Sequence, residues 1–302
     1  MSNPILDRVH KDAQRGYAGF RDTGVQNPQQ GYAPPQGHGQ QQPGYGQPQP
    51  GFGGPGTVPG LGGDGGGGGE RAITLDDVMF KTGTLFAVLL GVGAVSWFAV
   101  GAMPGLYAPV VMISLVATMG LALYFAFSKK PVSPVLAVVY SAIQGMLVGG
   151  ASAAFHMMFD PPGTAIFESI VTQAVLATLC VFGAMLTLYK TGIIKVTEKF
   201  RSMVLMAGAA YFVFALVNFA YAWFFDGGPF GFGGSGPLGI AISLFATGLA
   251  AVFLTLDFDN INTAIVTGAP EKYAWTLAIG LIATLVWLYI EMLRLLARLR
   301  SD

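Results

Sequence analysis

The sequence predicts an all-α membrane protein, a bundle of seven transmembrane helices preceded by a disordered N-terminal tail. Hydrophobic residues make up 53% of the 302 residues and charged residues only 11%, whereas charged residues are about 25% of an ordinary soluble domain. The charges lie mostly outside long apolar runs, and these runs are long enough to cross a bilayer. The first 70 residues differ from the rest, because they are rich in Gly, Pro and Gln.

Residues 1–70 form the first of two predicted regions. Their segment "GYAPPQGHGQQQPGYGQPQPGFGG" has too few apolar side chains to offset the conformational entropy lost on folding. No apolar stretch follows the first basic residues, so we expect no cleavable signal peptide. We therefore predict a disordered cytoplasmic tail over 1–70 and a transmembrane bundle over 71–302.

Seven apolar runs define the predicted bundle. Before them, Thr74 can cap a short helix with Asp76 and Asp77 in its first turn, where the helix dipole favours anions. None of the runs alternates apolar with polar residues, as a membrane strand would. About 20 residues suffice for a helix to cross the hydrocarbon core. The predicted spans are Leu85–Met103, Leu106–Phe127, Val132–Met158, Ser169–Tyr189, Met203–Phe225, Pro237–Leu256 and Tyr273–Leu295.

Basic residues predict the orientation of the bundle. The loops after the second, fourth and sixth spans hold seven Lys and Arg residues, and the other loops hold none. We therefore predict a multi-pass protein of the inner or plasma membrane with a cytoplasmic N-terminus. Arg294, Arg298 and Arg300 oppose this pattern, and they leave open an alternative with six crossings and a re-entrant last segment. The seven loop residues are Lys129, Lys130, Lys190, Lys195, Lys199, Arg201 and Lys272.

Two aspartates occur together in the sixth run, in the segment "LTLDFDNINTAI". The helix is expected to continue past Leu256 to a stop at Gly268, because Gly followed by Pro270 is typical of a helix C-terminus. Asp257 and Asp259 then lie within the helix, and residues two apart point about 200° away from each other. One of them can line a polar pathway, since ionisable residues at membrane depth mark ion or proton routes. The alternative is that both are solvated at the cytoplasmic interface.

Other polar residues extend this candidate pathway. Asn262 lies on the same helix face as Asp259, three residues further on. In the seventh span, Glu291 and Thr284 are two turns apart on one face. Glu291 either faces a polar interior or forms a local ion pair with Arg294, three residues later.

The remaining polar residues indicate no chemistry. We expect Gln144 and Asn218 to form hydrogen bonds between helices, and His156 to be interfacial. Cys180 is the only cysteine, which excludes an internal disulfide. The sequence has no phosphate-binding Gly loop, no metal-spaced His/Cys set and no nucleophile with a base, so we predict no enzyme, no cofactor and no metal site. A net charge of zero argues against nucleic acid as a partner.

Three further segments carry a resemblance to a known family. "YKTGIIKVTEKF", "LDFDNI" and "YAWTLAIGLIATLVWLYIEMLRLL", with the opening "LDDVMFKTG", resemble the Bax inhibitor-1 family and most closely its bacterial YccA-like branch. The resemblance covers about residues 72–300 and none of the tail. It implies a bundle with a central seventh helix wrapped by the other six. It also implies, for some members, a pH-sensitive calcium leak gated by acids on helices six and seven that share a proton.

The resemblance implies roles for particular residues. Phe258–Asp259 matches the aromatic–aspartate pair of the family, so Asp259 is favoured over Asp257. The position of the second acid falls near Thr284, and Glu291, one heptad away, is the substitute. We expect a cation leak with calcium as the transported ion and no cofactor; the alternative is a non-conducting regulator that binds another membrane protein, such as a protease. The pathway residues we expect are Asp259, Glu291, Asp257, Asn262 and Thr284.

Overall fold

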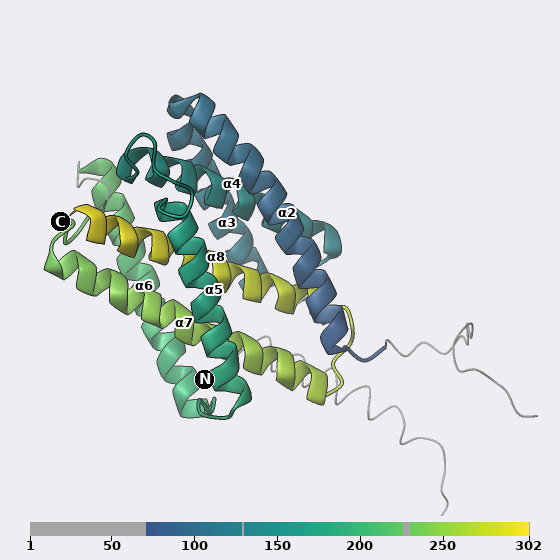
Figure 1. Cartoon of the computed structure of the whole chain (residues 1–302). Helices are drawn as coiled ribbons and strands as arrows, with labels where there is room; N and C mark the ends of the chain where they lie inside the picture. The colour runs from purple at the N-terminus through teal and green to yellow at the C-terminus, as the bar shows by residue number, and fades with distance from the viewer. Residues whose placement is uncertain (1–70, 129, 226–229, 302) are drawn as a thin grey trace, which may run out of the picture. The chain divides into compact units, whose positions relative to one another are not determined.

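The computed structural model describes residues 71–128, 130–225 and 230–301 (Figure 1), so the predicted tail over 1–70 lies outside it. The described residues contain helices and no strand. Seven helices are long and apolar enough to cross a membrane, which confirms the predicted fold class. The elements are α2 (Leu75–Ala102), η1 (Pro104–Leu106), α3 (Tyr107–Phe127), α4 (Pro134–Phe159), α5 (Ile170–Lys190), α6 (Glu198–Phe224), α7 (Pro237–Val266) and α8 (Tyr273–Ser301).

The first helix begins with a capping box. The Thr74 hydroxyl accepts a hydrogen bond from the Asp77 N–H, and the Asp77 carboxylate accepts one from the Thr74 N–H at 2.9 Å. The prediction of a separate short helix before the first span was wrong, because α2 continues unbroken from this cap to Ala102. Gly83 lies between the capped turn and the apolar run, but a single Gly costs only about 1 kcal/mol inside a helix, so one helix contains both.

Other helix boundaries also differ from the expected ones. Helix α6 begins at Glu198, so Lys199 and Arg201 lie in its first turn and not in the preceding loop. Helix α7 ends at Val266, and Gly268 has a φ of 65°, which confirms the predicted stop. Helix α8 is a single helix of 29 residues, which favours seven crossings over the re-entrant alternative.

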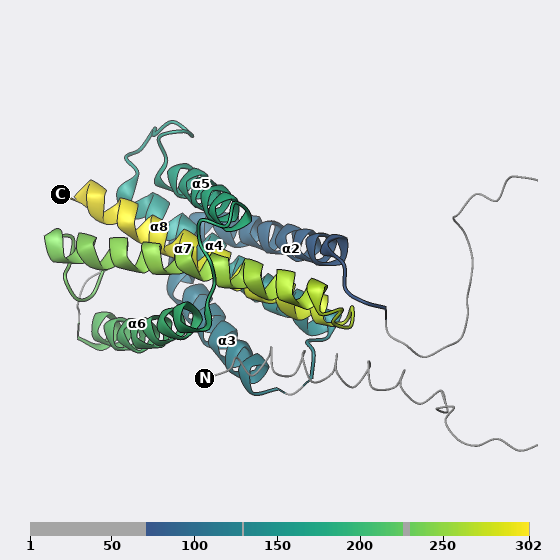
Figure 2. The ribbon, with the colours of Figure 1, turned by 90° about the horizontal axis from the view of Figure 1, so that it is seen from below.

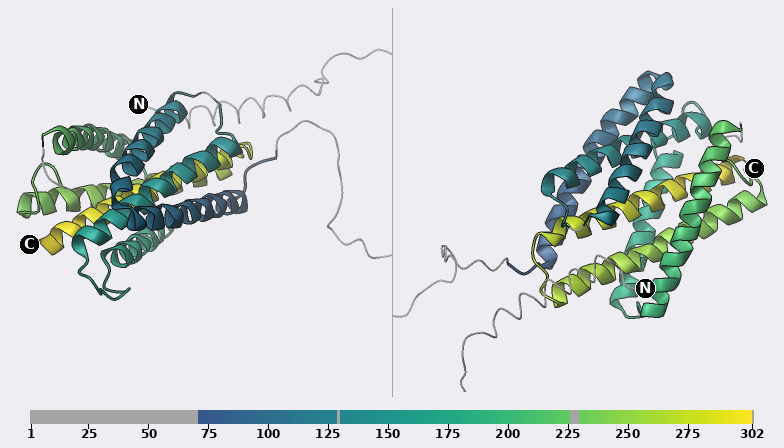
Figure 3. Two further views of the ribbon diagram at one scale, coloured as in Figure 1. Left: turned by 90° about the horizontal axis from the view of Figure 1, so that it is seen from above. Right: turned by 180° about the vertical axis from the view of Figure 1, so that it is seen from behind.

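The helices form three layers. Helices α4, α8 and α7 make the middle layer, α2 and α5 lie on one side of it, and α3 and α6 lie on the other (Figures 2 and 3). Helix α8 packs on α2, α4, α5 and α7, whereas α3 packs mainly on α4, and α6 packs on α7. The C-terminal helix is therefore central, but four helices surround it closely and not all six.

Helices α2 and α4 make the most extensive contact in the bundle. A methyl group built on Gly149 of α4 would overlap the carbonyl oxygen of Gly93 in α2. Because the two backbones are so near, side-chain hydroxyls reach across: Ser141 donates to the Leu85 carbonyl at 2.5 Å. Small residues allow this kind of approach where lipid removes the hydrophobic drive for association.

A polar cluster closes one end of the bundle, where the chain enters α2. Ala72 pairs with Pro270 in the loop between α7 and α8 as an isolated antiparallel bridge. Lys81 Nζ lies 2.9 Å from Glu271 Oε1 in that loop, and Arg71 Nη2 lies 3.2 Å from Glu271 Oε2. Lys81 and Arg71 hold the pKa of the Glu271 carboxyl below its ordinary value. The start of α2 and the start of α8 are thereby tied together.

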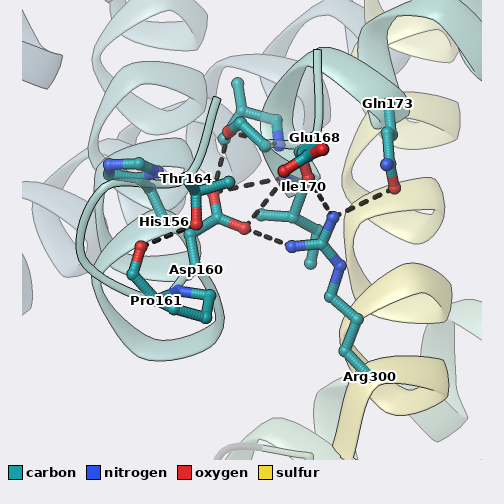
Figure 4. Close-up of polar contacts among 10 residues, drawn as sticks. His156, Asp160, Pro161, Thr164, Glu168, Ile170, Gln173 and Arg300 are labelled. Atoms are coloured by element: carbon teal, nitrogen blue, oxygen red, sulfur yellow. Dashed lines mark hydrogen bonds and ion pairs between the residues drawn. The ribbon is translucent and has the colours of Figure 1, made fainter. Parts of the chain in front are cut away.

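A second cluster closes the opposite end and is centred on Asp160, which follows α4 (Figure 4). Its side chain is fully buried. It accepts hydrogen bonds from the Ser169 hydroxyl at 2.8 Å and from the Ile170 N–H at 3.0 Å, and it contacts His156 Nδ1 at 2.7 Å. Arg300, in the last turn of α8, forms an ion pair with the same carboxylate. Asp160 therefore joins α4, the start of α5 and the end of α8.

These contacts predict an acid-sensitive contribution to stability. Burial alone would raise the pKa of Asp160, but its hydrogen-bond donors and Arg300 outweigh burial and lower it. Asp160 then stabilises the fold above the ordinary aspartate pKa of about 3.9, and this contribution is lost as pH falls through the lower folded value. We expect Asp160→Asn to lower the free energy of unfolding by about 2 kcal/mol at pH 7 and by progressively less as pH falls below the ordinary aspartate pKa of about 3.9.

The measurement is thermal unfolding of the detergent-solubilised protein between pH 7 and pH 2.5. Asp76→Asn is the matched control, because Asp76 is exposed in the first turn of α2. A constant difference between wild type and Asp160→Asn across this pH range would contradict the prediction.

Candidate functional site

The two aspartates of α7 face different surroundings. Arg201 Nη2 of α6 lies 2.5 Å from Asp259 Oδ2, and Arg201 Nη1 donates to Asn260 Oδ1 at 2.8 Å. The Tyr189 hydroxyl of α5 lies 3.4 Å from the other oxygen of Asp259. Asp259 is thus held in an ion pair between α5, α6 and α7 and does not face α8.

Asn262 does not join this ion pair. Its side chain is exposed, but it forms a hydrogen bond with the Tyr189 side chain, which also contacts Asp259. Residues three apart on a helix differ by about 60° in direction. This difference is small enough for Asn262 and Asp259 both to reach Tyr189 of α5.

Asp257 points toward the central helix. A methyl group on Gly280 of α8 would lie 3.8 Å from Asp257 Oδ1, and Thr284, one turn further along α8, is its polar neighbour. Asp257 Oδ2 is buried and has no hydrogen-bond partner among the described residues. The carboxyl lies about 13 Å along the helix from the end of α7, at 1.5 Å per residue. It is therefore the aspartate that faces the bundle interior at membrane depth.

Glu291 forms a second buried site further along α8. Its side chain is 4% exposed, and its carboxylate accepts a hydrogen bond from the Tyr211 hydroxyl of α6 at 2.7 Å. Arg294 Nη1 lies 3.2 Å away, so the predicted local ion pair is confirmed. Glu291 also lies in the bundle interior, so it both forms the local ion pair and faces a polar interior.

Asp259 and Glu291, which were expected to be coupled, do not contact each other. Asp259 is paired with Arg201, and Glu291 is paired with Tyr211 and Arg294. Thr284 lies nearer to Asp257 than to either group, two helical turns before Glu291. The five predicted residues therefore fall into an Asp259 site that Asn262 joins through Tyr189, an Asp257–Thr284 site and a Glu291 site.

Sequence reasoning missed the cations and the tyrosine of these sites. Arg201 was counted as a loop residue, Arg298 only as a charge that opposes the predicted orientation, and Tyr211 was not singled out. Arg298 is 1% exposed and donates to Ser243 Oγ of α7 at 2.9 Å. The seven-residue spacing of Glu291 and Arg298 places both on one helix face, and this was the available signal.

Other expected polar roles also changed. Gln144 Nε2 donates to Tyr140 on its own helix at 2.8 Å, so the expected bond between helices is wrong. Asn218 accepts from the Phe232 N–H at 2.6 Å and thereby fixes the loop before α7. Within the described ranges, no group of three or more His, Cys, Asp or Glu side chains is placed to hold a metal ion.

Comparison with known proteins fits this arrangement. The profile described as Bax inhibitor 1 like matches residues 3–301. The chain belongs to the Bax inhibitor 1 like family. The match begins far before residue 72, so the expectation that the resemblance leaves out the tail was wrong. No curated protein matches the chain. That this Bax inhibitor 1 like protein belongs to the YccA-like branch stays a prediction.

The geometry predicts opposite effects of two similar substitutions on stability. Asp259→Asn leaves the Arg201 guanidinium, 8% exposed, without a carboxylate, so we expect a loss of about 2 kcal/mol in unfolding free energy. Asp257→Asn removes a carboxylate that has no ion-pair partner within the described part of the chain, so we expect no loss or a small gain.

Chemical unfolding in detergent micelles measures both effects. The double variant Arg201→Gln, Asp259→Asn should be no less stable than Asp259→Asn alone, because the unpaired charge is removed with its partner. The ion-pair assignment fails if Asp257→Asn is the more destabilising of the two single changes.

Proposed function

We propose that this Bax inhibitor 1 like protein conducts cations, calcium above all, along the interface of α7 and α8. The observation that carries the proposal is the buried Asp257 carboxyl, which faces Gly280 and Thr284 with one oxygen unbonded by any described residue. A carboxylate at this depth is costly to keep and is typical of ion routes. The resemblance to calcium-leak members of the family supports the same function.

The candidate route favours transit over tight binding. Calcium takes six to eight oxygen ligands, and Asp257 and Thr284 supply too few to hold the ion. Glu291, further along α8, adds a second carboxylate, but Arg294 and Tyr211 occupy it in this conformation. A cation passing this point must displace Arg294, so the structure described here corresponds to a closed state.

The proposed pH response comes from Asp257 alone. A protonated carboxyl attracts no cation, so protonation reduces flux. In the acid pair implied by the family resemblance, one acid shares a proton with the other. Here the hydroxyl of Thr284 lies next to Asp257 in place of a second acid. We also propose that the protein catalyses no reaction and needs no cofactor.

We further propose that the protein resides in the inner or plasma membrane with its N-terminus in the cytoplasm. The seven basic residues near one end of the bundle support this orientation. Arg294, Arg298 and Arg300 lie at the other end, so the basic residues favour this orientation by seven to three.

Cysteine labelling tests the orientation. In a Cys180→Ser background, Lys195→Cys should react with an impermeant thiol reagent only after the cells are permeabilised. Ala165→Cys is the matched control in the α4–α5 loop and should react in intact cells; both positions are exposed. Labelling of Lys195→Cys in intact cells would invert the topology.

Calcium uptake into proteoliposomes tests the conduction proposal. We expect Asp257→Asn to lower the uptake rate about tenfold or more, because a fixed carboxylate is lost from the route. Uptake by Thr284→Val, which keeps the side-chain volume and loses the hydroxyl, should fall less. Asp259→Asn is the matched control and should retain most of the flux per folded protein.

Two results would contradict this assignment. A loss of flux in Asp259→Asn with full flux in Asp257→Asn would return the route to the aspartate favoured by the resemblance. Absence of uptake in wild type, with the fold intact, would reject conduction and favour the non-conducting regulator of a membrane partner.

A further inference from the structure

The connection between α5 and α6 carries basic side chains that the bundle does not use. Lys190 is the last residue of α5, Lys195 lies in the loop, and Lys199 lies in the first turn of α6. All three are exposed, and none forms an ion pair or a side-chain hydrogen bond with a described residue. We call residues 190–199 the basic segment. Its lysines are free to bind a partner outside the chain.

The charge of the basic segment is locally unbalanced. Its three lysines stand against one acid, Glu198, which leaves an excess of two positive charges. Arg201, the next cation along α6, is neutralised by Asp259. At the same end of the bundle, residues 71–81 and 267–273 have no excess, because three basic residues balance three acidic ones: Arg71, Lys81 and Lys272 against Asp76, Asp77 and Glu271. The basic segment therefore attracts a negatively charged partner more strongly than these neighbours do.

An apolar side chain lies at the tip of the same segment. Ile193 is 71% exposed. The residue before it, Gly192, has a φ of 71°, and the Ile193 N–H donates to the Leu188 carbonyl at 3.1 Å, so the turn is fixed to the end of α5. On the other side of the tip, Val196 packs against the core between α6 and α7. A fixed turn thus presents one large apolar side chain among the lysines.

The length of the connection determines which surface it meets. Helix α5 ends at Lys190 and α6 begins at Glu198, and both are long and apolar enough to cross a membrane. The seven residues between them, 191–197, span about 25 Å at most, and a loop that leaves and re-enters the membrane rises about half of that. The headgroup region on each side of the hydrocarbon core is itself about 5–7 Å thick. The basic segment therefore stays beside the lipid headgroups.

We propose that the basic segment is a docking surface for anionic phospholipids, with its three lysines at the headgroup phosphates and Ile193 in the apolar layer below them. A lysine side chain suits this position, because its apolar stem lies along lipid while its ammonium group reaches a phosphate. Basic residues next to a membrane-spanning helix attract anionic lipid. The proposed orientation places this surface in the cytoplasmic leaflet, but binding depends neither on that orientation nor on ion conduction.

The docking surface adjoins one of the sites described above. Tyr189 precedes the basic segment and Arg201 follows it, and both side chains contact Asp259 of α7. A lipid that binds the segment therefore holds the ends of α5 and α6 beside this ion pair.

An environment-sensitive label at the tip tests the docking surface. In the Cys180→Ser background, Ile193→Cys is labelled with nitrobenzoxadiazole, and the full-length protein is placed in lipid nanodiscs. The discs contain phosphatidylcholine, which has no net charge, or its mixtures with anionic phosphatidylglycerol. We expect phosphatidylglycerol to shift the label emission to shorter wavelength and to protect the label from iodide, because the lysines draw the tip toward the headgroups.

Lysine substitutions in the labelled protein test the role of charge. Lys195→Gln should weaken the apparent affinity for phosphatidylglycerol about fivefold, which is the effect of one lysine at an anionic membrane surface. Replacement of all three lysines by Gln should abolish the preference for this lipid. Lys130→Gln is the matched control, because it removes one exposed lysine from the α3–α4 loop, where Val132 is buried and forms no apolar tip. It should respond as the unsubstituted protein does.

The proposal is overturned if the label is equally accessible to iodide in neutral and anionic discs. It is also overturned if Lys130→Gln weakens the response as much as Lys195→Gln does, because the attraction would then follow net charge alone. Protection of the label by added polyglutamate, with none from phosphatidylglycerol, would reject the lipid and assign the lysines to an acidic protein. The exposed lysines have no partner within the described part of the chain, so these substitutions leave the fold intact.

Discussion

Helix α8 has to cross a bilayer while it carries Glu291, Arg294 and Arg298, and the rest of the bundle depends on this constraint. Charged side chains exposed to lipid tails are costly, so other helices must cover them. Helices α2, α4, α5 and α7 pack on α8. Helix α3, which has no charged residue, occupies the outer layer, with Ile113 and Val116 exposed.

Close approach of backbones makes this arrangement possible. Gly149 lets α4 lie against Gly93 of α2, and hydroxyl groups such as that of Ser141 then bond to carbonyls of the neighbouring helix. Lipid is as apolar as a leucine side chain, so dispersion and hydrogen bonds have to stabilise the contact. The two end clusters around Glu271 and Asp160 add charge pairing where water is near, and each holds one end of α8.

The acids of the bundle are used in different ways. Asp259 and Glu291 have cationic partners, which makes their charge inexpensive to keep. Asp257 has no such partner among the described residues and faces a helix whose nearest polar group is a hydroxyl. A paired carboxylate stabilises a fold, whereas an unpaired one at membrane depth is more easily understood as part of a function. This contrast places the proposed route at Asp257.

The sequence by itself determined the fold class, the seven spans and the helix stop at Gly268, because hydrophobic length and Gly–Pro signals act locally along the chain. It also showed that Asp257 and Asp259 must point apart. Only the tertiary structure decided which one faces α8, since helix periodicity gives relative directions and not the position of the neighbours. The partners Arg201 and Tyr211 are 58 and 80 residues from the acids they contact. Such pairings depend on how the helices pack, and no local pattern encodes them.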